Sequence, residues 1–235
     1  HIIDGVLNPN PNIVDVASSA DNFTALVDAL IQTGLDEALQ GAGPFTVFAP
    51  NDQAFAAVDL SGRTAEELTE ILQYHVVSGN IVSGDLTPPQ AVQSLSEDSL
   101  FITADGDIFV NDTGTVVNAD IGASNGTIHE ISSVLLPDAY QNIVGIVSKR
   151  YNLQTLEAAV IQAELASTLS GDGPFTVFAP INVAFEGIDI NSLSQQQLQD
   201  ILTYHVLPAE VLSGDISSGP QTTVNGATVE ITVDG

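Results

Sequence analysis

Two tyrosine–histidine pairs contain the residue types best suited to chemistry in this sequence. The pairs are Tyr74-His75 and Tyr204-His205, and each ends a stretch whose apolar residues recur at helical spacing. Histidine can act as a general base or a metal ligand, but no second histidine, cysteine or nucleophile stands at a matching local spacing. We therefore expect both histidines to be structural residues that form hydrogen bonds inside the fold.

Three aspartates form a candidate metal site. Asp105, Asp107 and Asp112 lie close together in the sequence, and carboxylates gathered around a turn can hold Ca²⁺. Their spacing is not that of an EF-hand, and Asp105-Gly106 is first of all a hairpin signal. The three aspartates therefore indicate either a calcium site or a plain hairpin. We expect no other cofactor.

Three asparagines fit the acceptor pattern for N-glycosylation. They are Asn22, Asn111 and Asn125. In a eukaryotic secretory pathway they would be glycosylation sites, and in a prokaryote the pattern is a coincidence.

The residues around these candidates occur twice. Gly-Pro-Phe-Thr-Val-Phe-Ala-Pro stands at 43–50 and again at 173–180, an offset of 130 positions that the two Tyr-His pairs share. A constant offset across separate motifs indicates a duplicated module of domain size. Repeated modules usually serve multivalent contact rather than one catalytic pocket.

Each copy is predicted to begin with helices. Apolar residues recur at helical spacing over 23–39 and over 153–169, before a short β-prone run in each repeated motif. A capping box precedes each helix that ends in a Tyr-His pair, and the two boxes are Thr64 with Glu67 and Ser194 with Gln197.

Strands follow the helices in the first copy. They are predicted at 99–103, 107–111, 116–119 and 128–135, separated by the turn signals Asp105-Gly106, Thr113-Gly114 and Asn125-Gly126. Helices followed by an antiparallel set of strands indicate an α+β module.

The charge balance excludes several classes of partner. The chain has 235 residues, 30 carboxylates and only 3 basic residues, which gives a formal net charge of −27. Such a surface repels phosphate backbones and anionic lipid, so we expect neither nucleic-acid binding nor contact with a membrane surface. No apolar run reaches the length of a membrane span, so we expect no membrane insertion of this segment.

The repeated motifs resemble those of fasciclin-like domains. The Gly-Pro-Phe-Thr-Val-Phe-Ala-Pro motif followed by Asn51-Asp52-Gln53, the Tyr-His pairs, and the closing segment 125–135 are similar to the family's three signatures in order. The resemblance implies two tandem modules, each a small β-sandwich or wedge with a helical layer on one side. It also implies secreted or surface-displayed adhesion and matrix proteins that are not enzymes. The second copy departs from the pattern at Ile181-Asn182-Val183, which weakens its helix cap.

The family's Tyr-His region has been linked to receptor contact. The resemblance therefore implies a partner-binding role for the two pairs as an alternative to the structural role, and its residues would be Tyr74, His75, Tyr204 and His205.

The ends of the chain are permuted relative to the module. Residues 1–9 match 129–137, so they read as the closing strand of a preceding or neighbouring module, followed by module 1 at 10–138 and a C-terminally incomplete module 2 at 139–235. One interpretation is an excerpt from a longer array. The other is strand exchange, in which residues 1–9 of one molecule complete the open sheet of another. The expected interface residues are His1, Ile2, Ile3, Val6, Leu7, Val229 and Ile231.

These observations favour a non-catalytic adhesion or matrix protein that lies outside the cell or on its surface. Its expected partners are other proteins, surface polysaccharide or copies of itself. The alternative is a subunit of an extracellular filament that assembles head to tail by strand exchange.

Overall fold

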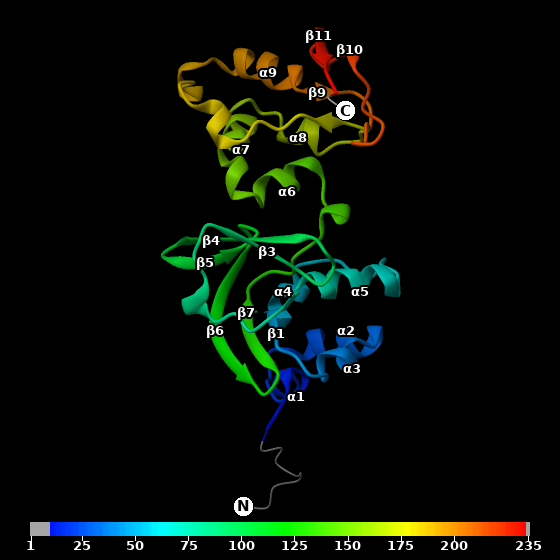
Figure 1. Ribbon diagram of the computed structural model, residues 1–235, viewed down its shortest axis with the longest axis vertical. Helices are drawn as coiled ribbons and strands as arrows, with labels where there is room; N and C mark the ends of the chain where they lie inside the picture. The colour runs from blue at the N-terminus through cyan, green and yellow to red at the C-terminus, as the bar shows by residue number, and fades with distance from the viewer. Residues whose placement is uncertain (1–9, 234–235) are drawn as a thin grey trace, which may run out of the picture. The chain divides into compact units, whose positions relative to one another are not determined.

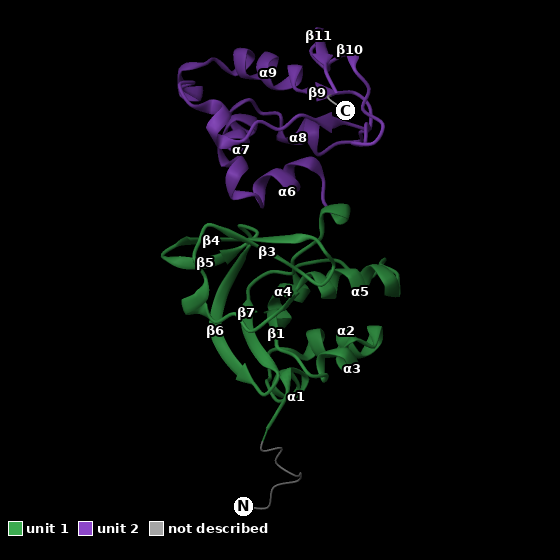
Figure 2. Ribbon diagram, in the orientation of Figure 1, with its two compact units in different colours: residues 1–140 green, residues 141–235 purple. Residues whose placement is uncertain are grey.

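The computed structural model describes residues 10–233, and the chain divides into two compact units, His1–Tyr140 and Gln141–Gly235 (Figure 2). The division falls two residues after the predicted boundary at 138. Tyr140 belongs to unit 1 because its hydroxyl donates a 2.5 Å hydrogen bond to Glu70 and its ring lies 4.6 Å from the Arg63 guanidinium carbon. Part of the predicted strand-exchange interface lies outside the described residues, namely His1, Ile2, Ile3, Val6 and Leu7.

Unit 1 packs its helices against a sheet (Figure 1). Its α-helices are α1 (Ile13–Ser18), α2 (Thr24–Thr33), α3 (Leu35–Leu39), α4 (Asp52–Ala56) and α5 (Ala65–Tyr74). Short 3₁₀ turns occupy η1 (Ser83–Asp85) and η2 (Asp138–Tyr140). The predicted helical segment 23–39 divides into α2 and α3 at Gly34, whose φ of 72° is a left-handed conformation that glycine adopts without strain.

The sheet of unit 1 has seven strands in the order β2-β1-β7-β6-β5-β4-β3. They are β1 (Phe45–Pro50), β2 (Val76–Ser78), β3 (Gln90–Gln93), β4 (Ser99–Asp105), β5 (Asp107–Val110), β6 (Gly114–Ala123) and β7 (Gly126–Ile131). The first and last strands of the module, β1 and β7, pair in parallel, from Phe45 opposite Gly126 to Pro50 opposite Ile131. A bridge between Val77 and Ser94 links the two ends of the strand order, so the sheet is nearly closed.

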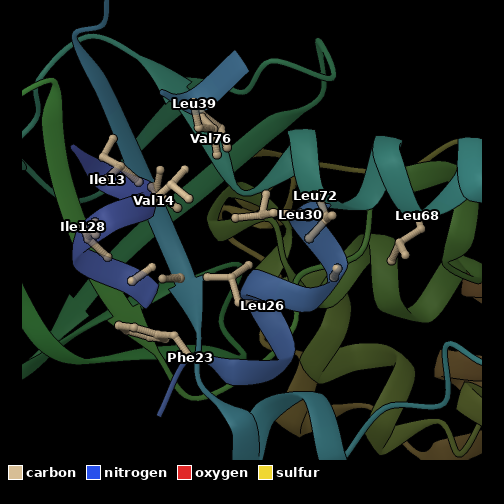
Figure 3. Close-up of a cluster of buried hydrophobic side chains, with 14 residues drawn as sticks. Ile13, Val14, Phe23, Leu26, Leu30, Leu39, Leu68, Leu72, Val76 and Ile128 are labelled. Carbon is tan, nitrogen blue, oxygen red and sulfur yellow. The ribbon is translucent and has the colours of Figure 1, made fainter. Parts of the chain in front are cut away.

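Two apolar clusters fill unit 1. The first lies between the helices and the sheet, where Leu26 and Leu30 of α2 meet Leu72 of α5 and Ile128 of β7 (Figure 3). The second lies within the curved sheet and contains Phe48 at 0% exposure together with residues of β4, β5 and β7. Each fully buried aliphatic or aromatic side chain of this kind contributes about 1.5–3 kcal/mol to the free energy of folding.

Unit 2 repeats the helical half of unit 1. Its helices are α6 (Ile143–Ser148), α7 (Gln154–Gln162), α8 (Ala166–Leu169) and α9 (Gln195–Tyr204), with 3₁₀ turns η3 (Tyr151–Leu153), η4 (Asn182–Phe185) and η5 (Ile190–Ser192). Its strands form two separate ladders. One joins β8 (Thr176–Val177) to β9 (Val206–Leu207), and the other joins β10 (Gly219–Thr222) to β11 (Thr228–Ile231). The described residues of unit 2 form one apolar cluster, and it is equivalent to the first cluster of unit 1.

Equivalent hydrogen bonds recur in the two units. The amide of Phe48 donates to the carbonyl of His75, and the amide of Phe178 donates to the carbonyl of His205, each over 2.9 Å. The hydroxyl of Thr46 reaches the Gly79 carbonyl, as its counterpart in β8 reaches the carbonyl of residue 209. The duplication predicted from the sequence therefore extends to individual hydrogen bonds.

The predicted caps are present. Both capping boxes form, with the Thr64 and Ser194 side chains each accepting from the backbone three residues on. At the weakened motif the difference is also as predicted. Asn51 caps the α-helix α4, whereas Ile181 provides no side-chain cap and the equivalent segment η4 is a 3₁₀ turn.

Candidate functional site

His75 is a buried link between α5 and the segment that follows β7. Its side chain is 1% exposed, and its Nε2 accepts a 2.8 Å hydrogen bond from the amide of Leu135. Its Nδ1 must then carry the proton, which it donates to the carbonyl of Ile71 over 2.7 Å. Burial lowers the pKa of His75 from 6.5 to about 4, and the bond to Ile71 opposes this shift only in part. The neutral ring joins two segments, and it is not accessible to a partner.

Tyr74 is also buried, at 0% exposure. Its hydroxyl donates to the carbonyl of Ser99 and accepts from Nδ2 of Asn111, both over 2.9 Å. The other end of that amide, Oδ1 of Asn111, accepts from the amide of Phe101. The structure therefore contradicts the alternative partner-binding role of Tyr74 and His75 and the glycosylation of Asn111 expected in a eukaryotic secretory pathway, because all three side chains are enclosed and bonded in the folded unit.

The second Tyr-His pair lies at the surface. Tyr204 is 37% exposed, and its hydroxyl donates to the carbonyl of Thr228 over 3.1 Å. His205 is partly exposed and its Nδ1 lies 2.8 Å from the carbonyl of Ile201, as in the first unit. A partner-binding role for Tyr204 and His205 stays a prediction.

The three aspartates do not form a common site. Asp105 and Asp107 face each other across the hairpin between β4 and β5, whereas Asp112 lies beyond the far end of β5. Across residues 10–233, no group of three or more acidic, histidine or cysteine side chains is arranged to hold a metal ion. The predicted calcium site at Asp105, Asp107 and Asp112 is thus replaced by the plain hairpin that Asp105-Gly106 also indicated.

The remaining glycosylation candidates differ in access. Asn125 is used by the fold, because its side-chain amide donates to the carbonyls of Leu39 and Gly41 and accepts from the amide of Ile13. Glycosylation at Asn125 is therefore incompatible with these contacts. Asn22 is exposed, so its modification stays a prediction.

The open edge of unit 2 is not the one predicted. Val229 and Ile231 lie in β11, which corresponds to β4 of unit 1, and there the neighbouring strands are β3 and β5. The closing strand β7 instead pairs with β1 and β6. A strand equivalent to β7 would therefore lie along β8, and Val229 and Ile231 would not form its pairing edge.

One buried histidine has a role that the sequence did not specify. His129 is 0% exposed, its Nδ1 accepts from the amide of Asp120 over 3.3 Å, and its Nε2 donates to the carbonyl of Ile81 over 2.9 Å. Its ring stacks on Phe48 at 5.5 Å between centroids. Its position in an apolar strand pattern was the only available signal, and that pattern indicates burial without naming partners.

A profile of the fasciclin domain matches residues 21–137 and again residues 151–235. The two matches lie one in each compact unit and together cover most of the chain. The chain belongs to the fasciclin domain family. The two fasciclin units are an α+β pair, as the sequence predicted.

Named relatives extend over both fasciclin units. Human periostin is 32% identical over 228 residues, which are 93% of this chain and 27% of periostin. The pig transforming growth factor-beta-induced protein ig-h3 is 31% identical over 212 residues, which are 84% of this chain and 31% of that protein. The chain thus spans less than a third of either protein. The Synechocystis protein sll1483 is 41% identical over 132 residues, which are 53% of this chain and 73% of that protein.

A solved structure has the same paired fold. It is a FAS1 domain pair from the insect cell adhesion molecule Fasciclin I, which matches with a TM-score of 0.62 and 16% identity over 90% of this chain and 83% of that one. At this identity the likeness concerns the fold. Among the helices described for our chain, none has both the length and the apolar character needed to cross a bilayer.

Within the first fasciclin unit, the residues with catalytic potential serve the fold. Tyr74, His75 and His129 each use their polar atoms for hydrogen bonds inside unit 1 and are at most 1% exposed. At these three positions the polar atoms therefore act as buried structural links.

Proposed function

We propose that this chain is a non-catalytic adhesion or matrix protein, outside the cell or on its surface, whose fasciclin units act by surface contact. The observation that carries the proposal is the use of Tyr74, His75 and His129 as enclosed links, which leaves the surface as the place where function resides. Membership of a family of adhesion and matrix proteins supports it. So does the fold shared with a domain pair from an insect cell adhesion molecule.

The charge of the chain limits its partners. At a net charge of −27, other proteins and uncharged or cationic polysaccharide are favoured over polyanions, and contact between copies needs salt to screen repulsion. Each contact would be weak on its own. Two units in one chain raise the local concentration of binding sites, so repetition supplies avidity.

Adhesion assays at controlled density test this proposal. Beads that carry the full chain are applied to extracellular matrix or to cell surfaces, and beads with an equally acidic globular protein serve as the control. We expect retention that rises more steeply than in proportion to surface density, because several units engage at once. Retention equal to that of the acidic control at every density would refute the proposal.

A second candidate function, a subunit of a filament, is supported by the edge of β8. In unit 1 the parallel partner of β1 is β7, and among the described residues of unit 2 no strand occupies the equivalent edge of β8. Ile131 and Leu135 of the closing segment fill the second apolar cluster of unit 1 at 0% and 1% exposure. Ile3 and Leu7 stand at the matching positions of residues 1–9, so this segment of a second copy could supply the same two side chains.

Negative-stain imaging and light scattering of the purified chain test the filament. We expect fibres or concentration-dependent growth that a double substitution, Ile3→Asp with Leu7→Asp, abolishes. Ile31→Asp is the control, because Ile31 is 59% exposed on α2 and belongs to unit 1. A chain that stays monomeric at high concentration would remove this candidate and leave adhesion by surface contact intact.

A further inference from the structure

Unit 1 has an open groove of about 640 Å³ at the end of the sheet where β1 and β7 begin. It is lined by the loop before β1, by Asn80 after β2, and by the hairpin between β6 and β7, at residues 42–44, 80 and 122–127. None of the lining residues is charged, on a chain with 30 carboxylates. None has a large apolar side chain either.

The groove is rigid because hydrogen bonds tie its walls together. The amide of Gly79 donates to the carbonyl of Pro44 over 2.8 Å, and the amide of Phe45 donates to the carbonyl of Asn125 over 3.0 Å. The side chain of Asn125 holds the end of α3, as described above. A Cβ on Gly126 would lie 1.9 Å from the carbonyl oxygen of Phe45, so the backbones of the two walls are in direct contact. A preformed groove of this kind loses little conformational entropy when a ligand binds.

The polar groups that line the groove are amides and hydroxyls. The hydroxyl of Thr127 donates to Oδ1 of Asn80 over 2.7 Å, which fixes that side chain and leaves its Nδ2 as a donor. Within residues 10–233, neither Nδ2 of Asn80 nor the hydroxyl of Ser124 has a protein hydrogen-bond partner, and both residues are exposed. The hydroxyl of Thr127 keeps acceptor capacity.

We infer that this groove binds an uncharged polysaccharide segment, an inference that rests on the proposed adhesive function and names a partner for one surface. A polyanion is repelled by the net charge of −27, and a polycation finds no carboxylate in the groove. An extended peptide binds through pockets for large side chains, which this lining of small residues does not provide. Sugar hydroxyls both donate and accept, so they match the exposed amide of Asn80 and the exposed hydroxyl of Ser124.

The second unit does not repeat this chemistry. The counterparts of Ala42 and Asn80 at the same offset are Asp172 and Glu210, and both are exposed. Two carboxylates therefore replace neutral side chains at the matching positions. The hairpin residues 122–127 have no counterpart among the described residues of unit 2, so the neutral groove is described in unit 1 alone.

The glycine at 122 permits a variant that blocks the groove and preserves the fold. A Cβ at Gly122 would meet no atom within 4 Å, and its φ lies outside the left-handed region. Gly122→Val therefore adds a side chain suited to a strand to the lining of the groove. Gly62→Val is the matched control, because Gly62 is equally open and lies outside the groove. Asn80→Glu copies the residue of unit 2.

Titration of the isotope-labelled full chain with sugars, followed by amide NMR, tests the inference. The probes are hexasaccharides of β-1,3-glucan, β-1,4-glucan, α-1,4-glucan and β-1,4-galactan, with oligogalacturonate and a lysine-rich peptide as charged controls and an alanine-serine-threonine peptide as the neutral peptide control. We expect at least one neutral sugar to shift the amides of residues 122–127 with a Kd on the order of 1 mM. Gly122→Val should raise that Kd at least about tenfold, Asn80→Glu should raise it less, and Gly62→Val should leave it unchanged.

The inference is overturned if no neutral sugar shifts these amides, if Gly122→Val and Gly62→Val bind equally, or if the neutral peptide alone shifts them. The adhesion assay separates this failure from that of the proposed function. Beads with Gly122→Val that adhere as well as the parent chain would refute sugar binding in the groove and leave adhesion by other surfaces standing. Retention of the parent chain equal to that of the acidic control would instead refute the adhesive function itself.

Discussion

Ile71 and Ile201 occupy the same position in α5 and α9, yet Ile71 is 0% exposed and Ile201 is 44% exposed. The same contrast holds for Tyr74 and Tyr204, at 0% and 37%. The helices themselves are alike, with the same capping geometry and the same Tyr-His end. Tyr74 packs in a cluster with residues of β5 and β7, and these strands have no counterpart among the described residues of unit 2.

The difference between the units divides the fasciclin fold into two parts, each with its own apolar cluster. The apolar cluster between the helices and the first strands is present in both units. The cluster within the sheet is described only in unit 1, where it contains residues of β4, β5 and β7. The helical layer thus packs on a strand pair as short as β8 and β9, whereas burial of Phe48 requires a nearly closed sheet. Most of the free energy that distinguishes the units should reside in this second cluster.

Truncation of the equivalent isoleucines tests the contrast most strongly. Ile71→Ala should cost unit 1 about 4 kcal/mol, because it leaves a cavity in a closed core. Ile201→Ala should cost unit 2 less than about 1 kcal/mol, because much of that side chain already contacts water. Urea unfolding followed through amide NMR signals assigned to each unit gives the two losses separately, since the pair need not unfold in one step. Similar losses in the two units would contradict the difference in burial between Ile71 and Ile201.

Acid should destabilise unit 1 through His75. Because burial lowers the folded pKa of His75 to about 4, the unfolded state binds more protons than the folded state between pH 4 and pH 6.5. The stabilisation from the neutral ring is therefore complete above pH 6.5 and is lost as the pH falls toward 4. The loss over this interval corresponds to about 3 kcal/mol.

The measurement is the free energy of unfolding of unit 1 across that pH range in the parent chain and in His75→Gln. The substitution should weaken unit 1 at neutral pH and flatten its pH dependence, while carboxylate titrations continue in both proteins. His205→Gln is the matched control, because the ring of His205 is partly exposed and belongs to the other unit. If the free energy of unfolding of unit 1 depends on pH in the same way in the parent chain and in His75→Gln, this role of His75 is contradicted.

Removal of the tyrosine hydroxyl should also cost unit 1 more free energy of unfolding than unit 2. The difference should be smaller than the one expected for the isoleucines. Tyr74→Phe leaves the carbonyl of Ser99 and the amide of Asn111 without a partner inside a closed core, which should cost about 2 kcal/mol. Tyr204→Phe removes one bond at a surface position, where water can replace it, and should cost about 0.5 kcal/mol. Unit-specific unfolding again gives both values, and equal costs would argue against the enclosed network around Tyr74.

The sequence predicted the local elements well because short-range chemistry sets them. The capping boxes at Thr64 and Ser194 and the hairpin at Asp105-Gly106 depend on residues only a few positions apart. The order of the strands in the sheet was harder to predict from the sequence. The parallel pairing of β1 with β7 joins residues about eighty positions apart, and no local pattern specifies it. For this reason the sequence points to Val229 and Ile231 as the open edge, whereas the pairing order of unit 1 indicates β8.

The candidate site was predicted only in part for a similar reason. The helical pattern before His75 indicated a structural histidine, but its partner at Leu135 is distant in the sequence and contributes only a backbone amide. Asn111 fits the glycosylation pattern and yet is buried, and its side chain bonds to Tyr74 at the end of α5. A sequence pattern records which atoms a residue has, whereas access to those atoms depends on the closed fold.

The smallest effect should come from a position where unit 1 has a side-chain cap and unit 2 has none. Oδ1 of Asn51 accepts from the amide of Ala54 over 3.0 Å and its Nδ2 donates to Glu130, whereas Ile181 offers neither bond. Ile181→Asn should stabilise unit 2 by about 0.5–1 kcal/mol and extend η4 toward an α-helical turn, because the asparagine side chain can accept from the amide of Ala184, which otherwise donates to the carbonyl of Ile181 within the 3₁₀ turn. The converse change, Asn51→Ile, should cost unit 1 somewhat more, because the bond to Glu130 of β7 is lost as well. Hydrogen exchange at the amides of residues 52–56 and 182–186 measures both changes. No gain in protection in unit 2 would mean that the shorter sheet, rather than the missing cap, sets the 3₁₀ geometry there.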